Sequence, residues 1–303
     1  MSEFVIVRPV VVTPAMLTSC SVDEPATGAD SDPAEWNPAT NYAPEALATR
    51  SATHKIYERL APGGIDAAAP ESDATKWVEV QPTNRWRLFD KSVGSQGSGN
   101  EEIVIVLTPG QIVDTVGVLN ADGSSVRVQV ADSEFDETKT LGVRVVDDWL
   151  EYLTEPFAVK RNVVFQGLPL RSGNVITITI SAPGGVARVG EIVLGHSRAL
   201  GGTRYGASTG ILDFSIKETN ELGYTELIER PYADTMNVEL LVDALRVDTV
   251  KQTLAQYRAK PVLWIGAGNL YESLIVYGFA REFEIVIAYA KHSLMSLEIE
   301  GLT

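Results

Sequence analysis

Short runs of β-branched residues, separated by glycine and proline, recur along the chain and predict a mainly β protein. In one such run Val126, Val128 and Val130 alternate with polar residues, and in Val175–Ile180 isoleucine alternates with threonine. A period of two is typical of a strand that buries one face. Strands of this kind recur at roughly ten-residue intervals, which favours a β-sandwich over residues 83–199.

Residues 200–303 show a second pattern, in which strands surround one amphipathic helix. Apolar residues spaced by three or four positions would form one face of that helix: Val247, Val250, Leu254 and Tyr257. This spacing predicts a helix over residues 243–258, capped by Asp243 or Asp248 and ended by Pro261. We therefore expect a β-rich α+β domain here, which the glycine-rich segment Gly201–Gly206 would join to the sandwich as a hinge.

The N-terminal 30 residues read as an arm and a linker. Phe4–Thr13 is β-branched, but Pro9 interrupts it, and proline inside a sheet is confined mostly to edge strands. We expect an edge strand or an extended arm that pairs with a strand of its own chain or of a neighbour. The acidic, proline-containing segment 23–33 then leads to the next unit.

Residues 31–82 form a short segment with several aromatic residues, which are our candidate glycan-binding side chains: Trp36, Tyr42, Tyr57 and Trp77. Sugars stack their C–H faces on aromatic rings, so an exposed ring here would form a binding surface. Aromatic rings are also an efficient way to stabilise so small a unit, and the same residues could be its core. Both interpretations stay open at this point.

Composition excludes several classes of function. The chain has 303 residues and a formal net charge of −15, which disfavours binding to the phosphate backbone of nucleic acids. A single cysteine rules out an internal disulfide framework, and three dispersed histidines give no metal-ligand spacing. We expect no metal site, no cofactor and no membrane insertion, and the first residues lack the pattern of a signal peptide.

One motif resembles catalytic machinery. Gly206–Gly210 matches the nucleophile elbow of hydrolases, with Ser208 as the nucleophile. That elbow needs a helix directly after the serine, whereas Ile211–Ile216 is β-branched and aromatic. We expect a chain without enzymatic activity and keep a hydrolase that uses Ser208 as an alternative.

Acidic residues provide weaker signals for chemistry. Glu101–Glu102 and Asp147–Asp148 are adjacent pairs, and neighbours on a strand point to opposite faces, so we interpret them as solvated charges. Asp122 and the segment Asp132–Glu137 contain oxygen ligands that suit calcium but lack EF-hand spacing. Whether a loop binds calcium stays open.

The segment 36–79 resembles a small chitin-binding carbohydrate module. The similarity rests on Trp36–Tyr42, on Lys55–Glu58 with its central Tyr-Glu pair, and on the closing Trp77-Val-Glu. This resemblance implies a compact β fold for residues 31–82.

A second resemblance covers nearly the whole chain, and it is to tail-tip or baseplate proteins of long-tailed bacteriophages and prophages. The strings that carry it are Arg8–Leu17, His54–Tyr57, Pro82–Asp90, Leu200–Gly206 and Ser296–Leu302. It implies a structural virion component without a catalytic site, and a middle domain like the galactose-binding sandwiches.

The expected partners follow from that resemblance. They are other phage tail proteins and further copies of the chain in a closed ring, with residues 200–303 as the ring-building part. Contact with host-surface glycans through the first two domains is an additional expectation. The protein would reside in the virion tail and, during assembly, in the host cytoplasm. A glycan-binding accessory protein without a virion role is the alternative.

Overall fold

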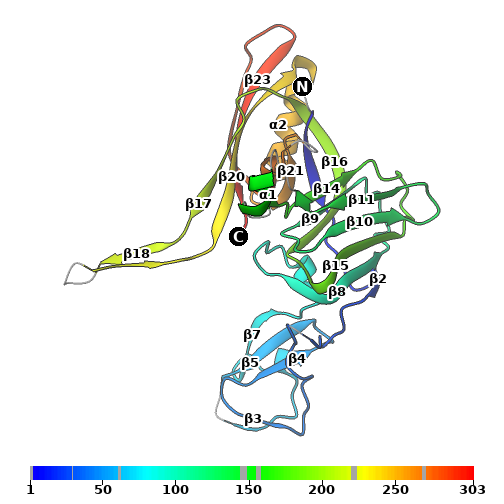
Figure 1. Cartoon of the computed structure of the whole chain (residues 1–303), viewed down its shortest axis with the longest axis vertical. Coiled ribbons are helices and arrows are strands. Elements are labelled where there is room, and N and C mark those ends of the chain that lie inside the picture. Colours follow the sequence, from blue (N-terminus) through cyan, green and yellow to red (C-terminus); the bar gives the residue numbers. More distant parts are fainter. Residues whose placement is uncertain are drawn as a thin grey trace.

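The computed structural model describes residues 3–28, 30–60, 63–143, 149–154, 158–219, 224–267 and 271–303. The chain is mainly β, as predicted, and its strands build a sandwich, a closed barrel, a small separate unit and a projecting arm (Figure 1). Asp147 and Asp148 lie outside the described residues. None of the helices in the described ranges combines the length and the hydrophobicity that crossing a bilayer requires.

The sandwich packs a five-stranded sheet against part of a nine-stranded sheet. The strand order of the smaller sheet is β11 (Asp136–Thr140), β10 (Ser125–Val130), β15 (Ile176–Val189), β8 (Gly97–Leu107) and β2 (Leu17–Cys20). The opposing layer consists of β14 (Val163–Gln166), β9 (Thr115–Leu119) and the first half of β16 (Glu191–Thr203).

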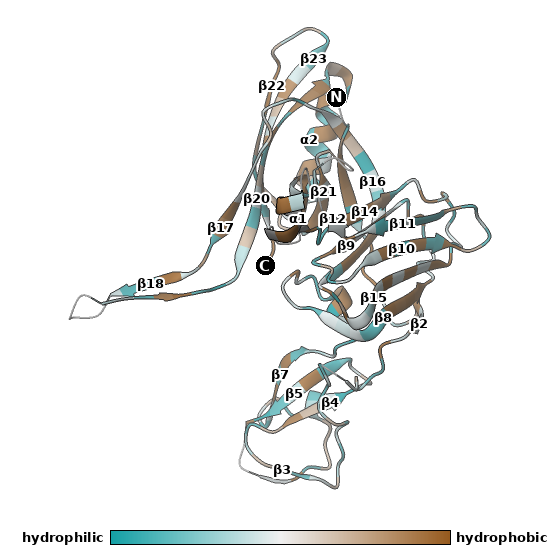
Figure 2. Cartoon of the chain, viewed as in Figure 1, coloured by the Kyte–Doolittle hydropathy of each residue, from teal (hydrophilic) through white to brown (hydrophobic). Residues whose placement is uncertain are grey.

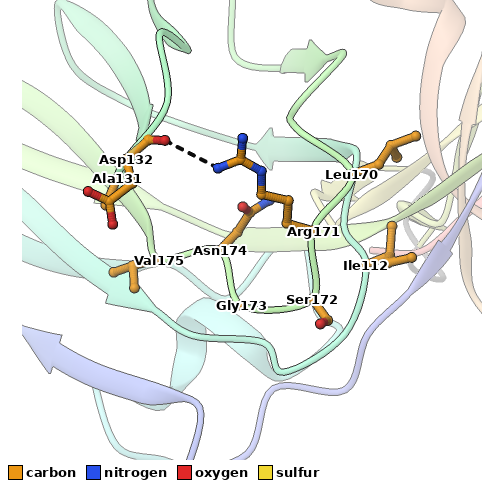
Figure 3. A pocket seen from close by; sticks show the side chains of 9 residues that line it. All are labelled: Ile112, Ala131, Asp132, Leu170, Arg171, Ser172, Gly173, Asn174 and Val175. Carbon is orange, nitrogen blue, oxygen red and sulfur yellow. Dashed lines mark hydrogen bonds between the residues drawn. The ribbon is translucent and has the colours of Figure 1, made fainter.

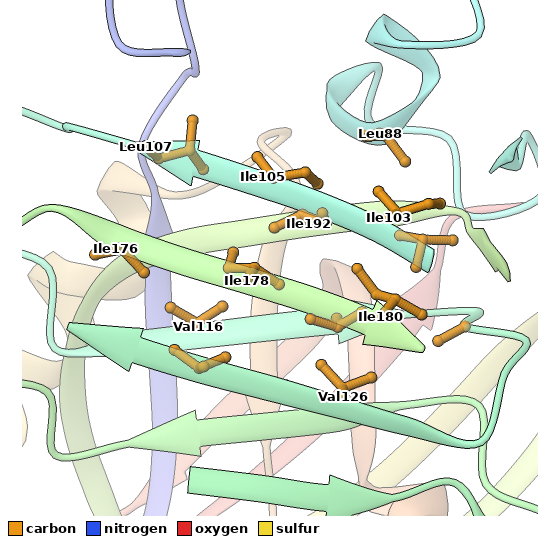
Figure 4. Close-up of a cluster of buried hydrophobic side chains, with 14 of the residues drawn as sticks. Leu88, Ile103, Ile105, Leu107, Val116, Val126, Ile176, Ile178, Ile180 and Ile192 are labelled. Carbon is orange, nitrogen blue, oxygen red and sulfur yellow. The ribbon is translucent and has the colours of Figure 1, made fainter. Parts of the chain in front are cut away.

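The alternating residues of the sequence form the sandwich core. Val126, Val128, Ile176 and Ile178 are buried between the two sheets, together with Phe165 from the opposing layer. Figure 4 shows part of this cluster, including Val126, Ile176 and Ile178. The intervening polar residues point outward because successive side chains of a strand face opposite sides. The strands predicted for this region therefore form a sandwich, as expected.

The rest of the nine-stranded sheet closes into a barrel of six strands. After β16 come β1 (Glu3–Pro9), β21 (Val262–Ile265), β22 (Ile275–Val286), β23 (His292–Gly301) and β20 (Tyr232–Asp243). The pairing of Gly202 with Leu241 brings β20 back to β16 and closes the circle. A closed barrel leaves no free edge among these strands.

The barrel core is built around Trp264. Its ring lies 6.2 Å from that of Phe4 between centroids, and its Nε1 donates a 3.1 Å hydrogen bond to the backbone oxygen of Gly278. Helix α2 (Val247–Gln256) adds Val250 and Leu254 to the same cluster. Burial of this apolar face holds the helix against the strands.

The predicted helix is confirmed, with shifted ends. A 3₁₀ turn, η3 (Ala244–Arg246), precedes α2, and Asp243 caps that turn because its Oδ1 accepts a 2.8 Å hydrogen bond from the backbone N–H of Leu245. The helix ends at Gln256, before Pro261 is reached, and Ala259 adopts a positive φ of 55°.

The expectation of an edge strand or extended arm at the N-terminus is wrong. β1 pairs with β16 on one side and with β21 on the other. Phe4 and Ile6 face the barrel core, whereas Val5 and Val7 join a second cluster on the outer face of the same sheet. Burial on both faces explains the uninterrupted apolar run, and Pro9 is tolerated because it stands at the end of the strand.

The expectation of a hinge at Gly201–Gly206 is wrong for the first residues of that segment. β16 continues through Gly201 and Gly202 as an unbroken strand. The glycines serve close packing. A Cβ atom on Gly201 would lie 2.5 Å from the backbone oxygen of Leu241, and one on Gly195 would lie 2.1 Å from that of Arg8. One continuous strand thus belongs to both the sandwich and the barrel.

The small unit lies at the far side of the sandwich from the barrel (Figure 1). Its strands are β3 (Asn41–Tyr42), β4 (Leu47–Arg50), β5 (Lys55–Arg59), β6 (Gly64–Ile65) and β7 (Trp77–Pro82), in one sheet of three strands and one of two. Glu24, before the unit, binds both His54 Nδ1 at 3.0 Å and Thr83 Oγ1 at 2.7 Å. This cluster fastens the unit to the linkers that join it to the sandwich.

A long hairpin extends from the barrel. β17 (Ser208–Asp213) pairs with the start of β20, and β18 (Ile216–Thr219) pairs with β19 (Thr225–Ile228) beyond it. Figure 1 shows this ribbon reaching away from the rest of the molecule. We call the described residues 208–219 and 224–232 the arm.

The remaining described elements are short. They are η1 (Pro70–Ser72), η2 (Trp86–Phe89), β12 (Gly142–Val143), α1 (Trp149–Thr154), β13 (Ala158–Val159) and η4 (Glu272–Leu274).

Candidate functional site

The four predicted glycan-binding rings gather in one place, where they form the core of the small unit. Tyr57 and Trp77 are buried, at 6% and 2% exposure, and Trp36 and Tyr42 pack against them with part of their surface accessible. The rings of Tyr42 and Trp77 meet edge to face at 5.1 Å. This geometry leaves Trp36 and Tyr42 as the rings of this cluster that a sugar could reach.

Charged side chains support this aromatic core. The guanidinium groups of Arg50 and Arg59 lie 5.2 Å from the ring centroids of Trp36 and Trp77, respectively. Arg59 is itself buried and forms an ion pair with Asp66, which Lys76 also contacts at 2.9 Å. Because Arg50 covers part of the Trp36 ring, a sugar would have to share or displace that contact.

Ser208 does not occupy a nucleophile elbow. It is exposed on β17, where it pairs with Asn237 of β20, and the chain continues as strand after it. The sharp turn from strand to helix that aims a nucleophilic serine is therefore not formed around Ser208.

Another serine, histidine and aspartate do meet, at the junction of β9 and β16. Asp114 Oδ2 lies 2.7 Å from His196 Nδ1 and accepts a 3.0 Å hydrogen bond from Ser197 Oγ. In a catalytic triad the histidine lies between the serine and the acid, so that it can take the hydroxyl proton. Here the carboxylate is in the middle, and these bonds fasten the start of β9 to β16.

A buried acidic cluster lies between the sandwich and the barrel. Glu191 is 5% exposed, and its Oε2 accepts a 2.8 Å hydrogen bond from the backbone N–H of Lys91. Burial raises the pKa of Glu191 to about 8, and the nearby charge of Asp90 acts in the same direction. Burial likewise raises the pKa values of the half-buried Asp90 and of the buried Tyr277.

One of the acidic residues considered as a calcium ligand already has a cation as its partner. Asp136 receives two hydrogen bonds from Arg127, at 2.8 and 2.5 Å, and Arg127 holds the pKa of that carboxyl below its ordinary value. Among the described residues, no three His, Cys, Asp or Glu side chains gather closely enough to hold a metal ion.

One cavity of about 530 Å³ opens among the loops at one end of the sandwich. Figure 3 shows Arg171 reaching across it, where Nη1 donates a 3.3 Å hydrogen bond to the backbone oxygen of Asp132. Leu170 and Ile112 add exposed apolar surface to the rim. The sequence motifs did not predict this pocket, because its lining comes from loops that only folding brings together.

A second cavity, of about 450 Å³, lies near the base of the arm. Tyr205 and Tyr271 line it, and both rings are exposed, whereas Leu274 and Ala267 below them are buried. Exposed aromatic surface over an apolar floor suits the stacking of a sugar or of an apolar side chain.

The arm is the most unusual surface of the described chain. Except for the half-buried Ile216, all of its residues are exposed. The exposed residues include large apolar side chains, such as Tyr224 and Leu227, which are 72% and 75% exposed. Figure 2 shows hydrophobic residues along both β17 and the distal pair of strands. Exposed apolar surface of this extent is typical of interaction sites.

The arm also presents open strand edges. β17 ends the nine-stranded sheet, and β18 and β19 pair with each other in a sheet of two strands. An isolated two-stranded ribbon is marginally stable in water and offers unpaired backbone groups to another chain. The sequence analysis predicted strands here but missed the arm. The signal that could have found it is the density of apolar residues between Ile211 and Tyr232 without a second apolar face to cover them.

In comparisons with known proteins, no protein-family model matches the chain, and no curated protein sequence matches it significantly.

Proposed function

We propose that this chain is a structural component of the tail tip or baseplate of a long-tailed bacteriophage, and that it acts by docking to copies of itself and to other tail proteins. The observation that carries the proposal is the arm, whose apolar side chains are exposed in the single chain. A protein that works alone gains nothing from this surface, which favours aggregation, whereas an assembly protein buries it against a partner.

The architecture behind the arm suits such a role. β20 runs without interruption from the arm into the barrel, where Met236, Val238 and Leu240 are buried. Because the strand is anchored in this core, a force on the arm reaches the barrel and, through β16, the sandwich. The sequence resemblance to tail-tip proteins supplies the biological setting of the proposal.

Labelling of assembled virions tests the setting directly. An antibody raised against the purified chain should decorate one end of the tail in negative-stain electron micrographs. Antibody absorbed with the purified chain is the control and should leave the virions unlabelled. The virion role would be refuted if virions carry no label at the tail although their host expresses the chain.

Contact with glycans is a second candidate function, which the exposed rings favour. Trp36 in the small unit and Tyr271 at the cavity beside the arm each present aromatic surface. A glycan array probed with the intact protein tests it, with Trp36→Ala and Tyr271→Ala as site variants and Val80→Ala, at an exposed position on β7, as the control. Binding lost in one site variant alone would locate the sugar, and a blank array would remove this function.

A further inference from the structure

A second exposed apolar surface lies at the other end of β20 from the arm. The turn between β22 and β23 and the preceding η3 expose large apolar side chains beside two cations. We call this surface the tip patch, and its residues are Leu245, Arg246, Val286, Ile287, Tyr289 and Lys291. The turn is held against η3, because the backbone N–H of Ala244 donates a 3.0 Å hydrogen bond to the oxygen of Lys291.

The arm and the tip patch of one chain cannot cover each other. β20 joins them, from Tyr232, which pairs with Asp213 of the arm, to Asp243, which pairs with His292 beside the tip. A strand of this length spans roughly 35 Å, at about 3.3 Å per residue. Figure 1 shows the arm and the β22–β23 turn pointing in different directions. Any contact between the two surfaces must therefore join different copies of the chain.

The charges of the arm are poorly arranged in the single chain. Glu218 and Glu226 are directly opposite each other in the β18–β19 pair, and both are exposed. Like charges at such a position destabilise a strand pair. Within the described residues neither carboxylate has an ion-pair partner. The arm would thus be more stable with a cation between the two acids.

A comparable pair in the barrel shows how the chain relieves this repulsion elsewhere. Glu282 and Glu298 are also opposite each other, in the β22–β23 pair, and there Arg281 Nη1 lies 3.5 Å from Glu298 Oε1. The acidic pair of the arm needs such a cation from outside.

The face of the arm that carries the two acids also carries apolar side chains. Residues two apart on a strand share a face, so Ile216 and Ile228 lie on the same side as Glu218 and Glu226. The tip patch offers the matching combination, with Ile287, which is 79% exposed, and Tyr289 next to Lys291. Each surface therefore combines an apolar area with charged groups, which are negative on the arm and positive on the tip patch.

We propose that the Glu218–Glu226 face of the arm docks on the tip patch of a second copy of this chain, with Lys291 and Arg246 of that copy neutralising the two carboxylates. The inference rests on the proposed function and deepens it by naming the two surfaces that meet. The contact joins two different surfaces, so repetition builds a ring if the rotation closes and a filament otherwise.

Charge reversal followed by charge exchange tests the docking. The intact protein, the arm variant Glu218→Lys/Glu226→Lys and the tip variant Arg246→Glu/Lys291→Glu are compared by analytical ultracentrifugation at low salt. Each variant alone should raise the dissociation constant of self-association at least tenfold, because like charges would then meet at the contact. An equimolar mixture of the two variants should recover mixed assembly, since each supplies the complementary surface that the other lacks.

A matched control separates this contact from the general effect of charge. Glu102→Lys/Glu134→Lys makes the same change in charge at exposed positions of the sandwich, outside both surfaces, and should leave self-association unchanged. Circular dichroism and the melting temperature of each variant establish that it is folded.

A cysteine pair provides a measurement that does not depend on affinity. In a Cys20→Ser background, Glu226→Cys and Lys291→Cys variants are mixed under mild oxidation. Disulfide-linked dimers should form in the mixture faster than in either variant alone.

The inference is overturned if the reversal variants assemble like the intact protein, if mixing them restores nothing, or if the chain is monomeric at every concentration. Virions that are labelled at the tail while the reversal variants still assemble normally would overturn this contact and leave the virion role standing.

Discussion

The buried carboxylate of Glu191 accepts a 2.8 Å hydrogen bond from the backbone N–H of Lys91, and this bond joins the loop before the sandwich to the strand that the sandwich and the barrel share. The bond does not offset the cost of burying a charge, since burial still raises the pKa of Glu191 to about 8. The shared strand therefore carries an acid that is neutral in the folded chain at pH values where it would be ionised in the unfolded chain.

The pH dependence of stability follows from that difference. Between about pH 4.5 and 8 the folded chain holds a proton on Glu191 that the unfolded chain has released, so the free energy of unfolding falls as the pH rises. One such group contributes a slope of about 1.4 kcal/mol per pH unit. Urea unfolding at pH 5, 6, 7 and 8 should show the decline, and Glu191→Gln should flatten it. Glu284→Gln, at an exposed position, should retain it, and an equally steep decline in Glu191→Gln would contradict the assignment.

Gly195 is predicted to tolerate no side chain. A Cβ atom there would lie 2.1 Å from the backbone oxygen of Arg8 and 2.7 Å from Val7 Cγ1, and β1 is fixed by strands on both sides. Gly195→Ala should lower the free energy of unfolding by about 3 kcal/mol or more, measured by urea denaturation. Gly173→Ala is the control, because no heavy atom lies within 4 Å of its Cβ position. Equal stability of the two variants would refute this account.

Trp77 should be essential to the small unit and dispensable for the barrel. Its ring is 2% exposed and contacts both Tyr42 and Arg59, so Trp77→Ala should cost about 3–5 kcal/mol locally. Hydrogen–deuterium exchange should accelerate in β4, β5 and β7 and stay unchanged in β20 and β23. Val80→Ala, on the same strand but exposed, should change neither region. Faster exchange throughout the chain would show instead that the units unfold together.

The buried ion pair of the small unit should be sensitive to the loss of one partner. Asp66→Asn leaves the guanidinium of Arg59, which is 2% exposed, without its counter-ion, and such a change costs about 3–5 kcal/mol. Asp73→Asn is the matched control, because Asp73 also contacts Lys76, at 3.4 Å, but its side chain is more exposed. Thermal unfolding of the two variants compares them, and equal melting temperatures would contradict the structural role of Asp66.

Part of the candidate site could be read from the sequence, and part could not. The aromatic residues of the small unit were identified, but a pattern of residues does not tell which rings face water, and packing places Tyr57 and Trp77 inside. The arm escaped prediction because the strands of a projecting ribbon have the same local pattern as strands of a sheet. The tip patch escaped for a related reason, since Leu245 and Ile287 are far apart in sequence and share a surface only after the barrel closes.

The sequence alone determined the strands of the sandwich, the helix after Asp243 and the β class of the chain, because alternation and helical spacing are local properties of the residues. Only the tertiary structure decided that β1 is an interior strand, that β16 belongs to two units and that six strands close a barrel. These features depend on pairing between segments that are distant in the chain, such as Val5 with Ala199 and with Ile265. The local pattern of residues does not specify which other strand a given strand pairs with.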